Sequence, residues 1–96
     1  MAIAGYLVRN EDVVWRDIAG EVVIAERDNV TVRVLNGTAS TVWILADGTK
    51  HVEDMVDEIC NRFEVTRAEA KADAEDFCRQ LLNAGLISLH DDSLGT

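Results

Sequence analysis

The side chains capable of nucleophilic, acid–base or metal chemistry are few in this sequence. Cys60 and Cys78 are its only cysteines, and they lie far apart and outside any Cys-x-x-Cys motif. His51 and His90 are its only histidines, and no His, Cys and Asp residues share the spacing of metal ligands. We expect two reduced, largely buried thiols and two solvated histidines. We predict no metal, no cofactor and no activated nucleophile.

Carboxylates are abundant, but their arrangement favours a solvated surface over a catalytic pair. The acidic residues between 53 and 58 fall on the polar side of a predicted helix whose other side is apolar. Gly37 and Gly48 flank another predicted helix and do not form a phosphate-binding loop. The sequence therefore indicates a binding module and not an enzyme.

Charge and composition narrow the class of partner. The 96 residues carry a formal net charge of −9 at pH 7, which argues against a nucleic-acid partner, because phosphates would be repelled. There is neither an apolar run of about 18 residues nor a basic segment followed by an apolar block, so we expect no membrane partner and a cytoplasmic location. The length fits one domain over residues 1–96, with a core from about residue 13 to residue 87 and flexible ends.

The elements that must position a binding surface are organised around Leu35–Gly48. Asn36 is a suitable N-cap, because its side-chain oxygen can accept from a free amide of the first turn. Gly48 is a suitable helix stop, because glycine tolerates the left-handed conformation. The apolar residues at helical spacing between them are Ala39, Val42, Trp43 and Ala46. We therefore expect a helix over about Asn36–Ala46, with strands before it and helices after it.

Three strands with short turns are predicted before the central helix. They cover Val13–Asp17, Glu21–Glu26 and Val30–Val34, and such short connections imply an antiparallel meander. The last of them alternates, with three valines on one face and Thr31 with Arg33 on the other, as in a half-buried sheet. Further upstream, the patch Gly5–Val8 predicts either an edge strand or a partly ordered arm.

Two further helices are predicted after the central one. Val52–Phe63 carries an unbroken apolar stripe and has His51 at its N-cap. Thr66–Ala84 begins with a Thr-x-x-Glu capping box and ends before Gly85, after which Leu86-Ile87 is expected to return to the core.

The last predicted helix has a wider apolar arc than a core contact requires. The arc of roughly 160° comprises Ala70, Ala74, Phe77, Cys78, Leu81, Leu82 and Ala84, against ~100° for one buried face. The surplus lies either at the Cys78 and Leu82 edge or at the Phe77 and Ala84 edge. Arg67 and Lys71 accompany the first of these edges, one or two turns earlier. The alternative is that the whole arc packs in the core and the charges are solvated.

The order of these motifs resembles the PqqD family of leader-peptide-binding domains, also called RiPP recognition elements. The resemblance rests on LNGTA, an apolar pair containing Trp43, DGT and then V-E-x-x-V-D-x-I, and it runs from about Val13 to Ile87. It implies an α+β fold, with a three-stranded antiparallel sheet followed by three helices, as in a winged helix-turn-helix. Family members often carry a proline early in the chain, whereas this chain has none.

The resemblance also implies a function and partners. In the family, the leader of a ribosomally made precursor adds as a strand beside the third strand and lies against the third helix. The domain then presents the precursor to a modifying enzyme, often a radical SAM protein. We place the same interaction on the open strand and on the Arg67 and Lys71 side of the last helix. The predicted peptide-binding residues are Val30, Thr31, Val32, Arg33, Val34, Arg67, Lys71, Ala74, Cys78 and Leu82.

Two other functions share this architecture. A winged-helix DNA-binding protein would present a basic recognition helix, whereas Val52–Phe63 is acidic and Thr66–Ala84 is mixed. A regulatory module would bind a protein partner only.

Overall fold

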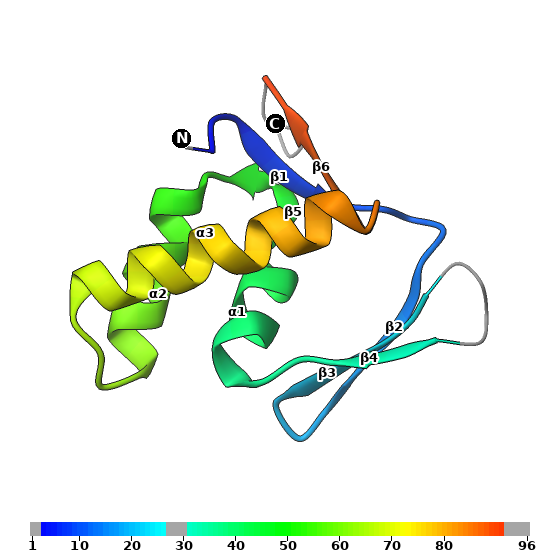
Figure 1. Ribbon diagram of the computed structural model, residues 1–96, viewed down its shortest axis with the longest axis horizontal. Coiled ribbons are helices and arrows are strands. Elements are labelled where there is room, and N and C mark those ends of the chain that lie inside the picture. Colours follow the sequence, from blue (N-terminus) through cyan, green and yellow to red (C-terminus); the bar gives the residue numbers. More distant parts are fainter. Residues whose placement is uncertain (1–2, 27–30, 92–96) are drawn as a thin grey trace.

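Two three-stranded antiparallel sheets and three helices make up the computed structural model, which describes residues 3–26 and 31–91 (Figure 1). The fold is α+β, as predicted. The elements are β1 (Tyr6–Arg9), β2 (Val14–Ile18), β3 (Glu21–Ala25), β4 (Val32–Val34), α1 (Gly37–Leu45), β5 (Asp47–Lys50), α2 (Val52–Arg62), α3 (Arg67–Asn83) and β6 (Ile87–His90).

The predicted meander forms one sheet, in the order β2-β3-β4, which we call the wing. Its inner face packs on α1 through Val22 and Ile24, which are fully buried. Ser40 of α1 stabilises this contact through two hydrogen bonds. Its hydroxyl accepts from the Val22 N–H at 2.9 Å and donates to the Leu35 carbonyl at 3.1 Å. The hydroxyl thus stands between two backbone groups at the junction of the wing and the helices.

The expected burial of the valine face of the last wing strand is wrong. Val32 and Val34 are 62% and 60% exposed, whereas Arg33 between them is half-buried, and Val30 lies outside the described residues. The register explains the reversal, because it places Arg33 opposite the buried Ile24 of β3. Directly opposite residues share a face of the sheet, so the arginine points inward and the valines point outward.

The second sheet, in the order β5-β1-β6, was not predicted as a sheet. The expectation of an edge strand or arm at Gly5–Val8 is wrong, since β1 is the central strand and Leu7 is fully buried. The expectation that only helices follow Gly48 is also wrong, because β5 and β6 pair with the two sides of β1. β5, with the sequence Asp-Gly-Thr-Lys, has no alternating pattern of its own, and β6 alternates over only four residues, so the strand character of both depends on pairing with β1.

The central helix follows its predicted bounds of about Asn36–Ala46 within one residue at each end. The Asn36 side chain accepts from the Ala39 N–H at 2.9 Å, which confirms the N-cap. The role expected for Gly48 is wrong: α1 ends at Leu45 with Ala46 as its C-cap, and Gly48 lies in β5 with φ of +89°.

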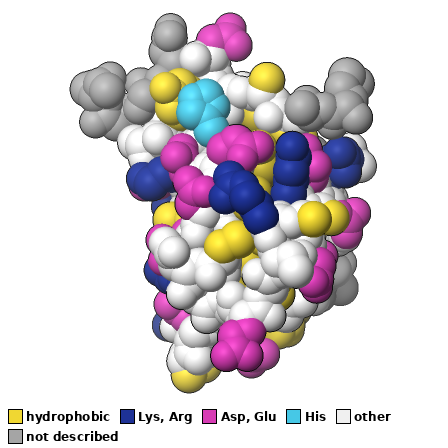
Figure 2. Space-filling view, turned by 90° about the vertical axis from the view of Figure 1, so that its left-hand side faces the viewer, with side chains coloured by type: hydrophobic (Ala, Val, Ile, Leu, Met, Phe, Trp, Pro, Cys, Tyr) yellow, Lys and Arg dark blue, Asp and Glu magenta, His cyan; other side chains and the backbone are white. Residues whose placement is uncertain are grey.

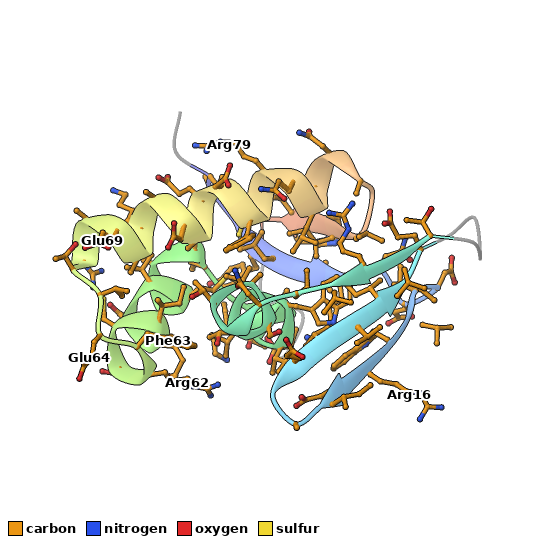
Figure 3. The ribbon with its side chains drawn as sticks, turned by 60° about the horizontal axis from the view of Figure 1, so that its bottom comes forward. Arg16, Arg62, Phe63, Glu64, Glu69 and Arg79 are labelled. Atoms are coloured by element: carbon orange, nitrogen blue, oxygen red, sulfur yellow. The ribbon has the colours of Figure 1, made fainter. Side chains whose placement is uncertain are left out.

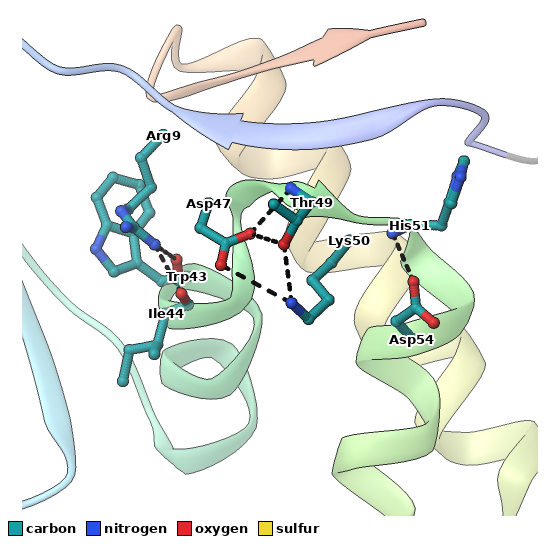
Figure 4. Close-up of polar contacts among 8 residues, drawn as sticks. All are labelled: Arg9, Trp43, Ile44, Asp47, Thr49, Lys50, His51 and Asp54. Carbon is teal, nitrogen blue, oxygen red and sulfur yellow. Dashed lines mark hydrogen bonds and ion pairs between the residues drawn. The ribbon is translucent and has the colours of Figure 1, made fainter. Parts of the chain in front are cut away.

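The other two helices lie within two residues of their predicted bounds. His51 is the N-cap of α2, and its backbone N–H donates to the Asp54 carboxylate at 2.9 Å (Figure 4). Thr66 caps α3 by accepting from the Glu69 N–H at 3.1 Å. Gly85 follows α3 with φ of +73°, the left-handed conformation that its lack of a Cβ favours. Leu86 and Ile87 then return to the core, as predicted.

Candidate peptide-binding site

The free edge of the wing at β4 is the first part of the candidate site. Among the described strands, β4 pairs only with β3. The Leu35 N–H donates to the Val22 carbonyl and the Glu26 N–H donates to the Thr31 carbonyl, so alternate residues from 31 to 35 direct their backbone groups toward β3. Because these groups alternate along an antiparallel strand, the N–H and C=O groups of Val32 and Val34 point to the open edge. An extended peptide can pair with groups oriented in this way.

The position of β4 in the wing matters as much as its open edge. Figure 3 shows β4 on the side of the wing that faces the helices, while β2 with Arg16 lies on the far side. An added strand lies about 4.8 Å from its neighbour, so a peptide paired with β4 would run between the wing and the helical half. The fold thus places the open edge on the side of the wing that faces the helical half (Figure 3).

Arg33 is the charged residue on the inner face of β4. Its Nε lies 3.4 Å from Glu26 Oε2, and both side chains are mostly shielded from solvent. The predicted site residue therefore stands beside the open edge with one acidic neighbour on its own sheet.

Two of the predicted site residues on α3 lie inside the core. Ala74 and Cys78 are fully buried and belong to the apolar cluster that joins the three helices. Burial, followed by the negative charge of Glu75, raises the pKa of the Cys78 thiol from 9.0 to about 12. These two side chains stabilise the helix packing and have no surface to offer a peptide.

The two basic residues expected at the site contact α2 instead. Arg67 donates to Asp57 at 2.7 Å and to Glu53 at 3.0 Å, and Lys71 lies 3.9 Å from Glu53. The hydrogen bond to Asp57 is the largest cause of a raised pKa at Arg67. Figure 2 shows this end of the molecule, where Lys and Arg side chains lie among Asp and Glu side chains. The structure does not bring this pair of cations to the edge of β4.

The two edges of the α3 arc face different parts of the fold. Lys71 and Glu75 line a hollow together with Ile3 and His51, on the side of the N-terminal segment. At ~100° per residue, Leu82 falls on this same side of the helix, and it is half-buried. Phe77 and Ala84 form the opposite edge and are also half-buried, with Asp73 and Gln80 exposed beyond them.

This opposite edge is turned toward the wing side of the fold. Because one side of α3 is directed toward β1 and the N-terminal segment, the other side is directed toward the space above β4 (Figure 1). The sequence identified both edges of the arc, but only the packing of α3 determines which one is turned toward the wing.

A third feature was missed in the sequence: the outer face of the wing is apolar and uncovered. Val14 and Ile18 of β2 are 66% and 57% exposed, and they share this face with Val32 and Val34. The signal that could have revealed it is the strongly apolar β3, because a register that buries Val22 and Ile24 directs alternate residues of every wing strand outward.

In the part of the chain that the structure describes, the other side chains that could take part in catalysis or metal binding lie apart from one another. Both thiols are free, with Cys78 buried and Cys60 only half-buried, so the expected burial holds fully for the first alone. His51 and His90 are exposed, as predicted. Residues 3–26 and 31–91 contain no group of three or more His, Cys, Asp or Glu side chains that could hold a metal ion, and no helix there could span a membrane.

Comparisons with known proteins point to one family. The model of the family described as coenzyme PQQ synthesis protein D (PqqD) matches residues 21–87. The solved structure of TbiB1 in complex with the TbiA(beta) leader peptide is similar to this chain, with a TM-score of 0.74 and 32% sequence identity. The similarity covers 88% of this chain and 99% of that one. A search of curated proteins found no match.

Proposed function

Because the chain belongs to the PqqD family, we propose that it binds the leader segment of a ribosomally synthesised precursor peptide as a strand added to β4. The observation that carries the proposal is the direction of the backbone groups of Val32 and Val34. These N–H and C=O groups point to the open edge, where an added strand can pair with them. They lie beside the helices in a fold similar to that of a protein bound to a leader peptide. Backbone pairing supplies the register of the leader, and side-chain contacts supply its specificity.

On α3, the leader-binding surface is the edge formed by Phe77 and Ala84. This edge is turned toward the wing side of the fold (Figure 1), and its half-buried apolar side chains leave surface that a peptide could cover. Phe77 is the largest of them, and an aromatic ring contributes much contact area at a binding surface. Arg67 and Lys71 have a smaller part, because their charges are already opposed by Glu53 and Asp57 of α2.

The bound leader delivers its precursor to a separate modifying enzyme. The domain itself supplies recognition, and the chemistry belongs to the partner, which in this family is often a radical SAM protein. We place this process in the cytoplasm, where precursor peptides are made on ribosomes.

A proline substitution at the open edge tests the proposal directly. The N–H of Val34 points away from β3, so Val34→Pro removes one edge donor while leaving the wing's own hydrogen bonds in place. The probe is the leader segment of a candidate precursor peptide taken from the neighbouring reading frames, with affinity measured by calorimetry. We expect Val34→Pro to weaken binding by about tenfold or more. The matched control Val34→Thr retains the N–H and should lose at most about fivefold.

Nuclear magnetic resonance gives the location of the bound leader. Amide shifts on titration should concentrate in β4 and on the Phe77 side of α3. Shifts confined to α2, with β4 silent, would mean that the leader binds elsewhere and that the proposed groove is wrong.

A further inference from the structure

The outer face of the wing extends without interruption to the edge of β4. By the register of the two strand pairs, it combines the outward residues of three strands. These residues are Val14, Arg16, Ile18, Glu21, Val23, Ala25, Val32 and Val34. Six of the eight are apolar, and the two charged ones have opposite signs. In a chain with a net charge of −9, this is a neutral surface.

The edge of this face lacks the features that keep edge strands from pairing. Natural sheets protect an open edge with charged side chains, prolines or bulges. Here the two residues whose backbone groups point to the edge are both valines, and the chain contains no proline. The wing also carries four large apolar side chains that are more than half exposed, where scattered single residues are the norm. Such an edge suits an incoming strand that is itself apolar on one side.

The size of the face argues against a second copy of the chain as its occupant. Estimated from their exposed fractions, the four most exposed side chains present on the order of 400 Å², about half of the ~800 Å² per partner that a standard interface buries. These side chains alone are therefore too small a surface for a stable dimer. The face is continuous with the edge at which the leader adds, and a strand paired there would place its own side chains beside the exposed valines.

We infer that the bound leader carries apolar side chains at two positions two residues apart, which lie over the outer face of the wing beside Val32 and Val34. This inference rests on the proposed strand addition at β4. Successive residues of a strand point to opposite faces, so every second leader residue must share the face of these two valines. The residue between the two apolar positions points inward, to the side of Arg33.

The geometry gives these two positions contacts that no other leader residue has. Leader residues directly opposite Val32 and Val34 have Cβ atoms about 4.5–5.5 Å from the valine Cβ atoms. An apolar side chain there removes from water the surface of a valine that is otherwise about three-fifths exposed. A polar side chain would not give this gain in free energy. Val32 also borders a shallow apolar hollow of about 150 Å³ that reaches Val23 and Val14. A long side chain opposite Val32 can extend toward this hollow, so we expect a large apolar residue at that position.

A displayed library of random dodecapeptides, selected against the whole domain, tests the inference without knowledge of the natural leader. The selected peptides should pair with β4 by amide shifts and should be enriched in two apolar residues separated by one other residue. Serine in place of either apolar residue in a selected peptide should weaken binding by about two- to fivefold.

Threonine variants of the domain give the matched comparison. Threonine preserves the branched shape of valine and replaces one methyl group by a hydroxyl. Val32→Thr and Val34→Thr should each reduce affinity by about two- to fivefold, and the double variant by about tenfold. Leu89→Thr is the control, because Leu89 is also an exposed apolar side chain but lies on β6, in the other sheet. It should leave affinity unchanged.

The possible outcomes separate this inference from the proposed function. Peptides that pair with β4 but show no apolar preference at alternate positions would overturn the inference and leave the function standing. Failure to select any peptide that perturbs β4 would overturn both. Sedimentation showing a dimer that Val14→Thr and Val32→Thr both dissociate would mean that a second copy covers the face, which also overturns the inference.

Discussion

The guanidinium of Arg9 lies over the ring of Trp15, with 5.2 Å between its carbon and the ring centroid. The same group donates from Nη1 to the carbonyls of Trp43 at 2.9 Å and Ile44 at 2.7 Å, at the end of α1 (Figure 4). A cation at the C-terminus of a helix also compensates its dipole. One side chain of β1 thus joins the wing, the central helix and the second sheet.

Arg9→Gln should therefore destabilise the domain. The variant loses the stacked cation and at least one charge-assisted hydrogen bond, which are worth about 2–4 kcal/mol together. Urea unfolding followed by tryptophan fluorescence measures the change, because Trp15 and Trp43 both lie in this cluster. Arg16→Gln, at an exposed position on the outer face of the wing, is the control and should change stability by less than about 0.5 kcal/mol. Equal losses in the two variants would contradict the role of Arg9.

Ser40→Ala should loosen the junction between the wing and α1. The variant removes the hydroxyl that stands between the Val22 N–H and the Leu35 carbonyl, leaving two buried backbone groups without that partner. We expect a loss of about 1–3 kcal/mol in the free energy of unfolding. Faster hydrogen exchange at the Val22 amide would locate the effect. The exposed Ser88→Ala should have little effect on either measurement.

The Cys78 thiol should make the domain less stable at high pH. Its folded pKa is raised from 9.0 to about 12, mainly by burial, so the folded state retains a proton that the unfolded state releases. The contribution of the neutral thiol is present below about pH 9 and is lost as the pH rises toward 12, by at most about 1.4 kcal/mol per pH unit. Urea unfolding at several pH values measures the slope. Cys78→Ala should flatten it, and an unchanged slope would show that other groups cause the effect.

The two edges of α3 should differ in their effect on leader affinity. Phe77→Ala should weaken binding by roughly tenfold, because it removes an aromatic contact on the edge that is turned toward the wing. Leu82→Ala, which trims the opposite edge, should leave affinity within about twofold of wild type. Calorimetry with the leader segment, on variants confirmed as folded by circular dichroism, provides the comparison. A larger effect at Leu82 would assign the groove to the other edge.

Arg67→Gln extends the same comparison to charge. Arg67 is exposed and pairs with Glu53 and Asp57 of α2, so its loss should change stability slightly and only at low salt. Leader affinity should change by less than about twofold. A strong, salt-dependent loss of affinity would instead place acidic leader residues against the start of α3.

Local signals in the sequence determined the helices, three of the strands and the family. The Asn36 and Thr66 caps, the apolar stripe of α2 and Gly85 each act within one or two turns of chain. Such interactions are readable because the residues that make them are neighbours in the sequence. The order of the same motifs was enough to indicate the PqqD family, which the match over residues 21–87 shows.

Only the tertiary structure decided which faces are covered. The pairing of β1 with β5 and β6 joins segments that are distant in sequence, and without it β1 resembles a loose arm. The valines of β4 have an alternation typical of a buried face, but the register with Ile24 turns them outward. In the same way, the packing of α2 against α3 pairs Arg67 and Lys71 with carboxylates of α2. A side chain's periodicity reveals that a face exists, but burial depends on what packs against it, and that partner lies elsewhere in the chain.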